Sequence, residues 1–430
     1  MTTEKKSPVY FASLTVGNVK CFKEEQTIDL TDKQGNFAQW TVILGNNNTG
    51  KSTMLELLAG LEAVPLPNDI QELFNNNNNY NVYRPIITDR LLSNIIMIDW
   101  ANNFVIKVKL FANGTLTNNI WGLERAKYYQ TSSESVDSHN IMKEFKIYNY
   151  GVNRSYGVNS KLSSNKPIEL FSGFLGSNEL GNTEEWLLQT YLAEKNGVKS
   201  AGLYLEKVKK VLISGVLPDV KDLSFETSQQ PPYNTYVLFD TDYGKLRLHE
   251  LGYGYQSSIS WLGDLMKRQF DRYPDSENPL AEPAIVLVDE IDMHLHPEWQ
   301  RKIIQFLSHH FPKTQFIVTS HSPLVVQSAE NVNVVLLNKE GDKTIISQPD
   351  IKTFKGWTVV EILEELMGLE GKTRSEYYLQ LIQQFDEALD QENAEQAVQL
   401  HEKLSEILHP ASTQRKLLRI QMAGLTPKPL

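Results

Sequence analysis

The sequence predicts an α/β fold built on buried strands, and three short segments carry that prediction. Trp40–Leu44 is an apolar run that leads into a glycine-rich loop, Ala284–Glu290 is an apolar run that ends in two carboxylates, and Phe316–Val318 leads into Thr-Ser-His. Short apolar runs of this length, bounded by polar or turn residues, are typical of strands buried on both faces. A long insertion separates the glycine-rich loop from the carboxylates.

Bulk composition places the chain among ordinary globular proteins. The 430 residues are 41% hydrophobic and 22% charged, enough for two or three units with a large core. The single cysteine, Cys21, excludes an internal disulfide framework. Since no apolar run approaches the roughly 20 residues that span a bilayer, and Met1–Tyr10 is too polar for a signal sequence, we expect a cytoplasmic protein.

The net charge of −10 argues against binding of nucleic acid over the whole surface, because phosphate neutralisation needs a basic face. Two Lys/Arg-rich stretches in expected helices, Glu206–Lys210 and Arg415–Arg419, leave a local basic groove open. Such clusters are more often solvated helix faces than binding sites. Nucleic acid is therefore a possible partner but not the favoured one.

Periodicity predicts the elements in order. Tyr10–Leu30 alternates apolar and polar residues as a half-exposed strand pair does, and Lys51–Leu61 has the apolar spacing of a helix. The asparagine run Asn75–Asn79 indicates an exposed loop, and strands return within Ile95–Leu110. Further helices are expected at Thr183–Glu194 (with Asn182 or Thr183 as N-cap), Ala201–Leu212, Val359–Met367, Ser375–Asp390, Ala394–Leu408 and Thr413–Met422, and a hairpin at Thr235–Leu248.

The glycine-rich loop Gly45–Ser52 fits the phosphate-loop pattern G-x-x-x-x-G-K-[ST], between a strand and a helix. Backbone N–H groups of such a loop bind phosphate at the helix N-terminus. We expect Lys51 to reach the β- and γ-phosphates of ATP and Ser52 to ligate Mg²⁺. The expected nucleotide-binding residues of the loop are Gly45, Asn46, Asn47, Asn48, Thr49, Gly50, Lys51, Ser52 and Thr53.

Polar residues at the ends of the two later strands complete the predicted catalytic set. Two adjacent carboxylates at the end of a buried strand cost too much to serve packing alone, so we expect Asp289 to hold Mg²⁺ and Glu290 to polarise the attacking water. His321 follows the third strand, where a histidine can contact the γ-phosphate. The order of these motifs describes a nucleoside triphosphatase of the ABC type.

The segment after the carboxylate pair, Asp292–Pro297, allows two interpretations. His294 and His296 have a spacing that could bind a metal, but no cysteine or further histidine supports this. A loop that contacts a second subunit is the favoured interpretation, with Asp292 as its main functional member.

The motifs closely resemble those of the RecF- and OLD-like branch of ABC ATPases, which includes SMC-like repair ATPases and ATPase subunits of bacterial anti-phage systems. The start Leu14–Phe22 resembles the start of those proteins, and the tail from Trp357 to Pro410 resembles that of single-domain defence ATPases. The matching motifs are Gly45–Ser52, Val288–Asp292, Leu295–Pro297 and Thr319–Pro323.

This resemblance implies a head-to-tail dimer that holds ATP between one subunit's phosphate loop and the other's signature helix. The best match to the signature Leu-Ser-x-Gly is Leu251–Gln256, before a helix expected at Ser257–Arg268. Gly252 replaces the serine, although the amide of Gly254 and the helix N-terminus can still face the γ-phosphate. Loss of a charge-assisted hydrogen bond of ~1.5–3 kcal/mol predicts slow hydrolysis or lasting ATP-bound assembly.

The expected architecture is an α/β ABC-type P-loop NTPase with an antiparallel β lobe, a helical signature lobe and a C-terminal helical tail. The ATPase domain is expected at 1–345, with an insertion at 62–182 and the helical and signature lobe at 183–270, and the tail at 346–430. The Q-loop glutamine has no clear position. Tyr150–Arg154 resembles a Tyr-Gly-x-x-Arg stretch of related ATPases, in which Arg154 meets phosphate or is a surface residue without a role.

The favoured function is an ATP-driven sensor or scaffold of a two-component anti-phage system, of the PARIS or Septu type, that holds a separately encoded effector, in our expectation a nuclease. The chain itself is not expected to be a nuclease, because few residues follow His321 and they lack a Toprim-like pattern. Missing coiled-coil arms argue against an SMC-like repair protein. The alternative is a RecF-like DNA-binding clamp in repair.

Overall fold

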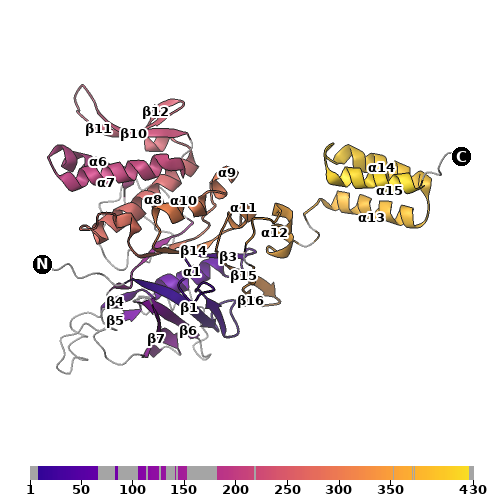
Figure 1. Cartoon of the computed structure of the whole chain (residues 1–430), viewed down its shortest axis with the longest axis horizontal. Coiled ribbons are helices and arrows are strands. Elements are labelled where there is room, and N and C mark those ends of the chain that lie inside the picture. The colour runs from indigo at the N-terminus through magenta and orange to yellow at the C-terminus, as the bar shows by residue number, and fades with distance from the viewer. Residues whose placement is uncertain are drawn as a thin grey trace. The chain divides into compact units, whose positions relative to one another are not determined.

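The computed structural model describes residues 8–65, 83–85, 105–112, 115–124, 127–131, 141, 144–152, 182–216, 219–351, 353–369, 371 and 373–425, and the statements below concern these residues. They form two compact units, Met1–Ile362 and Leu363–Leu430 (Figure 1). The division falls later in the chain than the expected boundary at residue 345. Among the described residues, no helix is long and apolar enough to cross a membrane.

A six-stranded sheet forms the centre of the first unit. Its order is β16-β15-β3-β14-β13-β9, and all neighbours are parallel except β15 and β16. The strands are β3 (Trp40–Gly45), β9 (Ile147–Tyr150), β13 (Ala284–Val288), β14 (Thr314–Thr319), β15 (Asn333–Glu340) and β16 (Lys343–Ser347). Because β14 lies between β3 and β13, the three motif-bearing strands are neighbours and their carboxyl ends lie together.

An antiparallel sheet of order β2-β1-β6-β7-β8 forms the second layer. Its strands are β1 (Val9–Gly17), β2 (Gln26–Asp29), β6 (Val105–Ala112), β7 (Thr115–Glu124) and β8 (Lys127–Thr131). Side chains from β1, β6 and the helix α1 (Lys51–Gly60) pack in one core with the central sheet, including Phe11, Leu14, Leu55 and Leu58. β4 (Ala63–Pro65) and β5 (Tyr83–Pro85) form a separate antiparallel pair, which also belongs to the expected insertion.

A lobe of helices and a small sheet precedes β13. It contains α6 (Thr183–Lys195), α7 (Lys199–Val211), the π-helical turn η2 (Leu212–Val216), the sheet of β10 (Val220–Thr227), β11 (Thr235–Thr241) and β12 (Gly244–Leu246), the turn η3 (Leu248–Glu250) and α8 (Tyr253–Arg272). Asn182 caps α6 by accepting a hydrogen bond from the Glu185 amide. The sequence missed β10, and α8 begins four residues before the predicted start at Ser257, at Tyr253.

Short helices complete the first unit around the ends of the central strands. They are η4 (Pro279–Ala281), α9 (Pro297–Gln300), α10 (Ile303–His310), α11 (Pro323–Gln327) and α12 (Val359–Glu365), the last of which crosses the division between units. Ser322 caps α11, directly after His321.

The second unit is a three-helix arrangement with a core of its own. It consists of α13 (Glu376–Asp390), α14 (Ala394–Ile407) and α15 (Thr413–Leu425), close to the predicted bounds. Its buried residues follow helical spacing on α13 and α14 and include Leu381, Phe385, Leu400 and Leu404. Ser375 and Asn393 cap the first two helices through their side-chain oxygens.

Candidate nucleotide site

The phosphate loop joins β3 to α1 with the geometry that its glycines permit. Gly50 has φ 96°, and a Cβ there would lie 2.6 Å from Cys21 Sγ and 2.8 Å from Phe22 Cζ. A Cβ on Gly45 would lie 2.7 Å from the Leu337 carbonyl oxygen. Both positions therefore exclude a side chain, one through backbone conformation and both through close packing.

Within the loop, the structure separates residues that brace it from residues that face outward. Asn46, Asn47, Asn48 and Ser52 are exposed. Thr49 is buried, and its hydroxyl donates to the Asn46 carbonyl oxygen at 2.9 Å. Ser52 is exposed and lies in the first turn of α1.

Lys51 is buried against the loop and surrounded by carboxylates. Its Nζ donates to the carbonyl oxygens of Gly45 (2.8 Å) and Asn46 (3.0 Å), which uses two of its three N–H donors. Burial lowers the pKa of Lys51, and the negative charges of Asp289, Glu290 and Asp292 oppose that effect. The predicted catalytic acids are thus near enough to Lys51 to influence its charge.

Asp289 and Glu290 are held by the neighbouring strands. The backbone amide of Asp289 donates to the Tyr150 carbonyl oxygen at 2.8 Å, and the Thr319 hydroxyl donates to Asp289 Oδ1. The Glu290 amide in turn donates to Thr319 Oγ1 at 2.7 Å. One hydroxyl therefore links both carboxylate residues, and sequence reasoning did not single out Thr319.

Glu290 has φ 49°, a left-handed conformation that is uncommon for a residue other than glycine. Such strain costs on the order of 1–3 kcal/mol and is concentrated at functional sites. The conformation turns the chain sharply after β13, so that Asp289 is buried while Glu290 is only partly buried.

His321 lies on the exposed surface at the end of β14, as predicted. Its backbone amide donates to Asp292 Oδ1 at 3.3 Å, and the preceding Ser320 amide donates to the Ile43 carbonyl oxygen at 3.3 Å. The Asp292 carboxylate therefore ties the segment after β13 to the segment after β14. These bonds bring Asp292 and His321 to the same edge of the sheet as the phosphate loop.

Lys20 is a second cation near the loop that sequence reasoning missed. It lies in the turn between β1 and β2, and its Nζ donates to Thr53 Oγ1 and Glu56 Oε2, both at 3.3 Å. Burial raises the pKa of Glu56, and Lys20 opposes that effect. The signal was available in the Leu14–Phe22 start motif, which contains Lys20.

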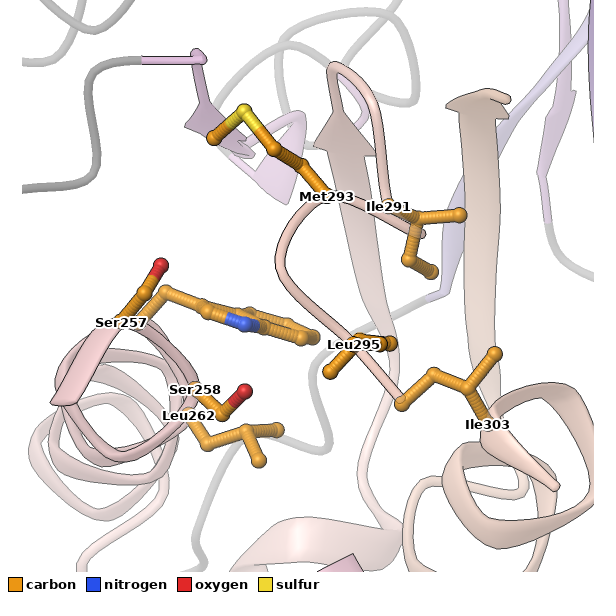
Figure 2. A pocket seen from close by; sticks show the side chains of 8 residues that line it. Ser257, Ser258, Leu262, Ile291, Met293, Leu295 and Ile303 are labelled. Atoms are coloured by element: carbon orange, nitrogen blue, oxygen red, sulfur yellow. The ribbon is translucent and has the colours of Figure 1, made fainter. Parts of the chain in front are cut away.

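The expected signature segment contacts the Asp292–Pro297 loop in the same chain. Gly252 is the N-cap of α8 and supplies no side-chain cap, while Gly254 lies in the first turn. A Cβ on Gly254 would lie 2.4 Å from the His294 carbonyl oxygen, so this glycine allows the helix to meet the loop. Figure 2 shows Ser257, Ser258 and Leu262 of α8 on one side of a small hollow, and on the other side Met293 and Leu295 of that loop with Ile291 just before it.

The two histidines of this loop contact different partners in the structure. His294 packs edge-on against the Tyr253 ring, 4.7 Å between centroids, and His296 Nδ1 accepts a hydrogen bond from the Glu298 amide at the start of α9. Within the described ranges, no group of three or more His, Cys, Asp or Glu side chains is arranged to bind a metal.

The first Lys-rich stretch is largely engaged within the protein. Lys207 donates to the Glu277 carbonyl oxygen at 2.8 Å, and Lys209 forms an ion pair with Asp222 at 2.6 Å. Arg154 lies outside the described residues, but β9 places the start of its Tyr150–Arg154 stretch beside Asp289.

Comparison with known proteins agrees with this geometry. Residues 167–327 match the family model described as "AAA domain, putative AbiEii toxin, Type IV TA system". The chain is 36% identical over 192 residues to the Septu protein PtuA of Bacillus thuringiensis, which covers 44% of this chain and 48% of that protein. It is 25% identical to the Retron Vc95 probable ATPase of Vibrio cholerae serotype O1 biovar El Tor, over 70% of this chain and 69% of that protein.

The chain is therefore similar, over part of its length, to an AAA domain and to Septu and retron proteins. The match spans about half the length of the Bacillus thuringiensis PtuA. An SMC head bound to the C-winged helix domain of ScpA is a structural neighbour of this chain, with a TM-score of 0.43 and 13% identity over 80% of this chain and 98% of that one. Strand order and the phosphate loop, rather than this likeness, assign the fold.

Proposed function

We propose that this ATPase binds and hydrolyses ATP in the cytoplasm as the sensor or scaffold subunit of a two-component anti-phage system. The observation that carries the proposal is the convergence of the phosphate loop, Asp289–Glu290 and His321 at one edge of the central sheet. Relatives named for Septu and retron systems support the defence context. The chain would hold a separate effector, in our proposal a nuclease, and would not itself cut nucleic acid.

In this proposal the loop binds the phosphates and the strand ends perform the chemistry. The third N–H donor of Lys51 and the exposed loop amides bind the β- and γ-phosphates. Ser52 and Asp289 supply oxygen ligands of the kind that Mg²⁺ prefers, and the ion would neutralise charge on the phosphates. Glu290 accepts the proton of the attacking water, and His321 contacts the γ-phosphate.

The site is half of a pair in the proposed dimer. The N-terminus of α8, with Gly252 and Gly254, would complete the phosphate site of a second copy, while Asp292 would contribute to the contact between subunits. Because Gly252 lacks a hydroxyl, we expect slow turnover and an ATP-bound dimer that persists.

The surface of the second unit supports a role in holding a partner. Its helices expose apolar side chains, with Ile420 at 69% and Tyr377 at 56% exposure. None of its described residues forms an ion pair, although α13 and α14 carry exposed acids such as Glu387, Glu402 and Glu406. Exposed apolar side chains are available for contact with a partner.

The test is co-expression with the neighbouring gene, followed by purification and mass photometry with and without ATP and Mg²⁺. A stable complex of discrete mass that contains both proteins supports the scaffold. If the protein does not bind the product of the neighbouring gene but gains mass on added duplex DNA, the result would instead indicate a RecF-like clamp.

A further inference from the structure

Tyr150, at the end of β9, is bonded to two parts of the proposed catalytic apparatus at once. Its backbone carbonyl oxygen accepts the hydrogen bond from the amide of Asp289 at 2.8 Å. Its side-chain hydroxyl donates to Asp264 Oδ2 on α8 at 3.0 Å. A single residue thus connects the backbone of the metal-binding carboxylate with the signature helix.

This connection is buried and charged. Tyr150 is 1% exposed and Asp264 is 4% exposed. Asp264 Oδ2 also accepts from Arg268 Nε at 2.6 Å, one turn further along α8. Burial and then the Asp264 charge raise the pKa of Tyr150 well above its usual value, so its hydroxyl remains protonated and donates. The buried carboxylate of Asp264 needs both hydrogen bonds, because a buried charge without partners is costly. The geometry of the Tyr150–Asp264 bond is therefore specific.

The middle of α8 is packed on the same side as this bond. The Tyr150 ring lies 5.5 Å from the Trp261 ring, and Trp261 also lines the hollow together with Ile291, Met293 and Leu295. On another side of the helix, a Cβ on Gly263 would lie 2.2 Å from Thr183 Cγ2 at the start of α6. The helix therefore has little freedom to slide, and the Tyr150–Asp264 bond is a polar contact that fixes its register against β9.

We infer that Tyr150 is a positioning residue for ATP hydrolysis, because it fixes the signature helix relative to Asp289 and Glu290 of the same chain. The inference rests on the proposed function, in which the N-terminus of α8 serves the second copy's nucleotide. With the bond in place, a movement of β13 at one nucleotide site is transmitted to α8, which acts at the other. Without the Tyr150–Asp264 bond, each site still binds ATP, but α8 of one copy no longer aligns with the phosphate loop and Glu290 of the other for turnover.

The test compares Tyr150→Phe with Tyr10→Phe in the full-length protein. Tyr10 is a matched control, because it is also buried and its hydroxyl also makes a hydrogen bond, to the Lys313 carbonyl oxygen at 2.8 Å. Both variants lose one buried hydroxyl and should lose similar thermal stability. Only Tyr150→Phe should lower kcat, by about tenfold, with KM for ATP changed by less than about twofold.

Asp264→Asn provides a second variant if Tyr150→Phe folds poorly. Its carboxamide oxygen can still accept from Tyr150, so it should retain more turnover than Tyr150→Phe despite the loss of the Arg268 ion pair. Equal kcat in Tyr150→Phe and wild type, or an equal fall in Tyr10→Phe, overturns the inference. Absence of turnover in the wild-type protein would instead count against the proposed ATPase function.

Discussion

Glu290 combines a strained backbone with a partly buried carboxylate beside the phosphate loop. Its amide is fixed by Thr319, so the side chain is presented from a rigid turn rather than from a mobile loop. A general base gains from such pre-organisation, because little reorganisation is needed when it takes the proton of the attacking water.

Glu290→Gln should reduce ATP turnover by about 100-fold or more, since the amide keeps the shape but cannot accept the proton. Affinity for ATP should remain within a few-fold of wild type. Steady-state phosphate release and binding of a fluorescent ATP analogue measure the two quantities. Glu298→Gln is the control, because Glu298 lies in the same region but is exposed and pairs only with Lys302. Undiminished turnover in Glu290→Gln would remove Glu290 as the base.

His310 gives a pH-dependent contribution to stability. Burial, His309 and Lys210 lower its pKa to about 4, so the folded protein favours the neutral ring, which hydrogen-bonds Ser214 at 2.9 Å. This stabilisation is complete above the unfolded pKa near 6.5 and is lost as the pH falls toward 4. We expect a loss of about 1 kcal/mol between pH 7 and pH 5, after allowing for screening of the half-buried ring. His310→Gln should reduce that loss in urea unfolding. An unchanged pH dependence in the variant would contradict this assignment.

At the residue scale, the sequence predicts side chains that directly follow a strand and fails for those that act across strands. Asp289, Glu290 and His321 were readable because each ends an apolar run. Thr319 and Tyr150 act on Asp289 only because β14 and β9 flank β13, and strand order is not visible in local pattern. Lys20 was missed for the same reason, because it lies in the turn between β1 and β2 and reaches α1 only in the folded protein.

At the scale of elements, α8 is the part whose start was predicted least well. Helix signals placed it at Ser257, because the two glycines before that residue are poor helix formers. The structure extends it to Tyr253, because close packing of Gly254 against the His294 carbonyl oxygen outweighs that propensity. Strand β10 was missed because its burial pattern does not alternate regularly.

Gly252→Ser tests the role of the N-terminus of α8. The site is open, since the nearest atom to an added Cβ is 3.6 Å away in the Tyr255 ring, so serine should be accommodated without strain. Its hydroxyl would supply the hydrogen bond that the signature lacks, and we expect ATP-dependent dimerisation to tighten by about tenfold or more. Gly252→Ala is the matched control and should show no such gain. If serine and alanine behave alike, the N-terminus of α8 does not face a γ-phosphate.

At the scale of the whole molecule, the two units have separate cores, which permits separate tests. The predicted helices of the second unit match the structure closely because each has regular apolar spacing, and α13 and α14 also begin at side-chain caps. The position of the division was predicted less well, because β16 extends the central sheet to Ser347 and chain contacts continue to Ile362.

Removal of residues 363–430 should leave nucleotide binding unchanged within about twofold, because every proposed ATP-binding residue lies in the first unit. The truncated protein should no longer bind the co-expressed product of the neighbouring gene. Co-purification and binding of a fluorescent ATP analogue measure both outcomes on one preparation. A truncated protein that still retains the neighbour would exclude the second unit as the docking surface.

We expect ATP to close two copies of this chain at the site formed by the phosphate loop, Asp289–Glu290 and the N-terminus of α8. Mass photometry of Glu290→Gln, with and without ATP and Mg²⁺, is the sharpest test, because ATP hydrolysis then does not dissociate the dimer. ATP should at least double the mass of the predominant species, and Lys51→Ala should abolish this change. If a variant that is shown to bind the nucleotide has the same mass with and without ATP, ATP does not close two copies of the chain.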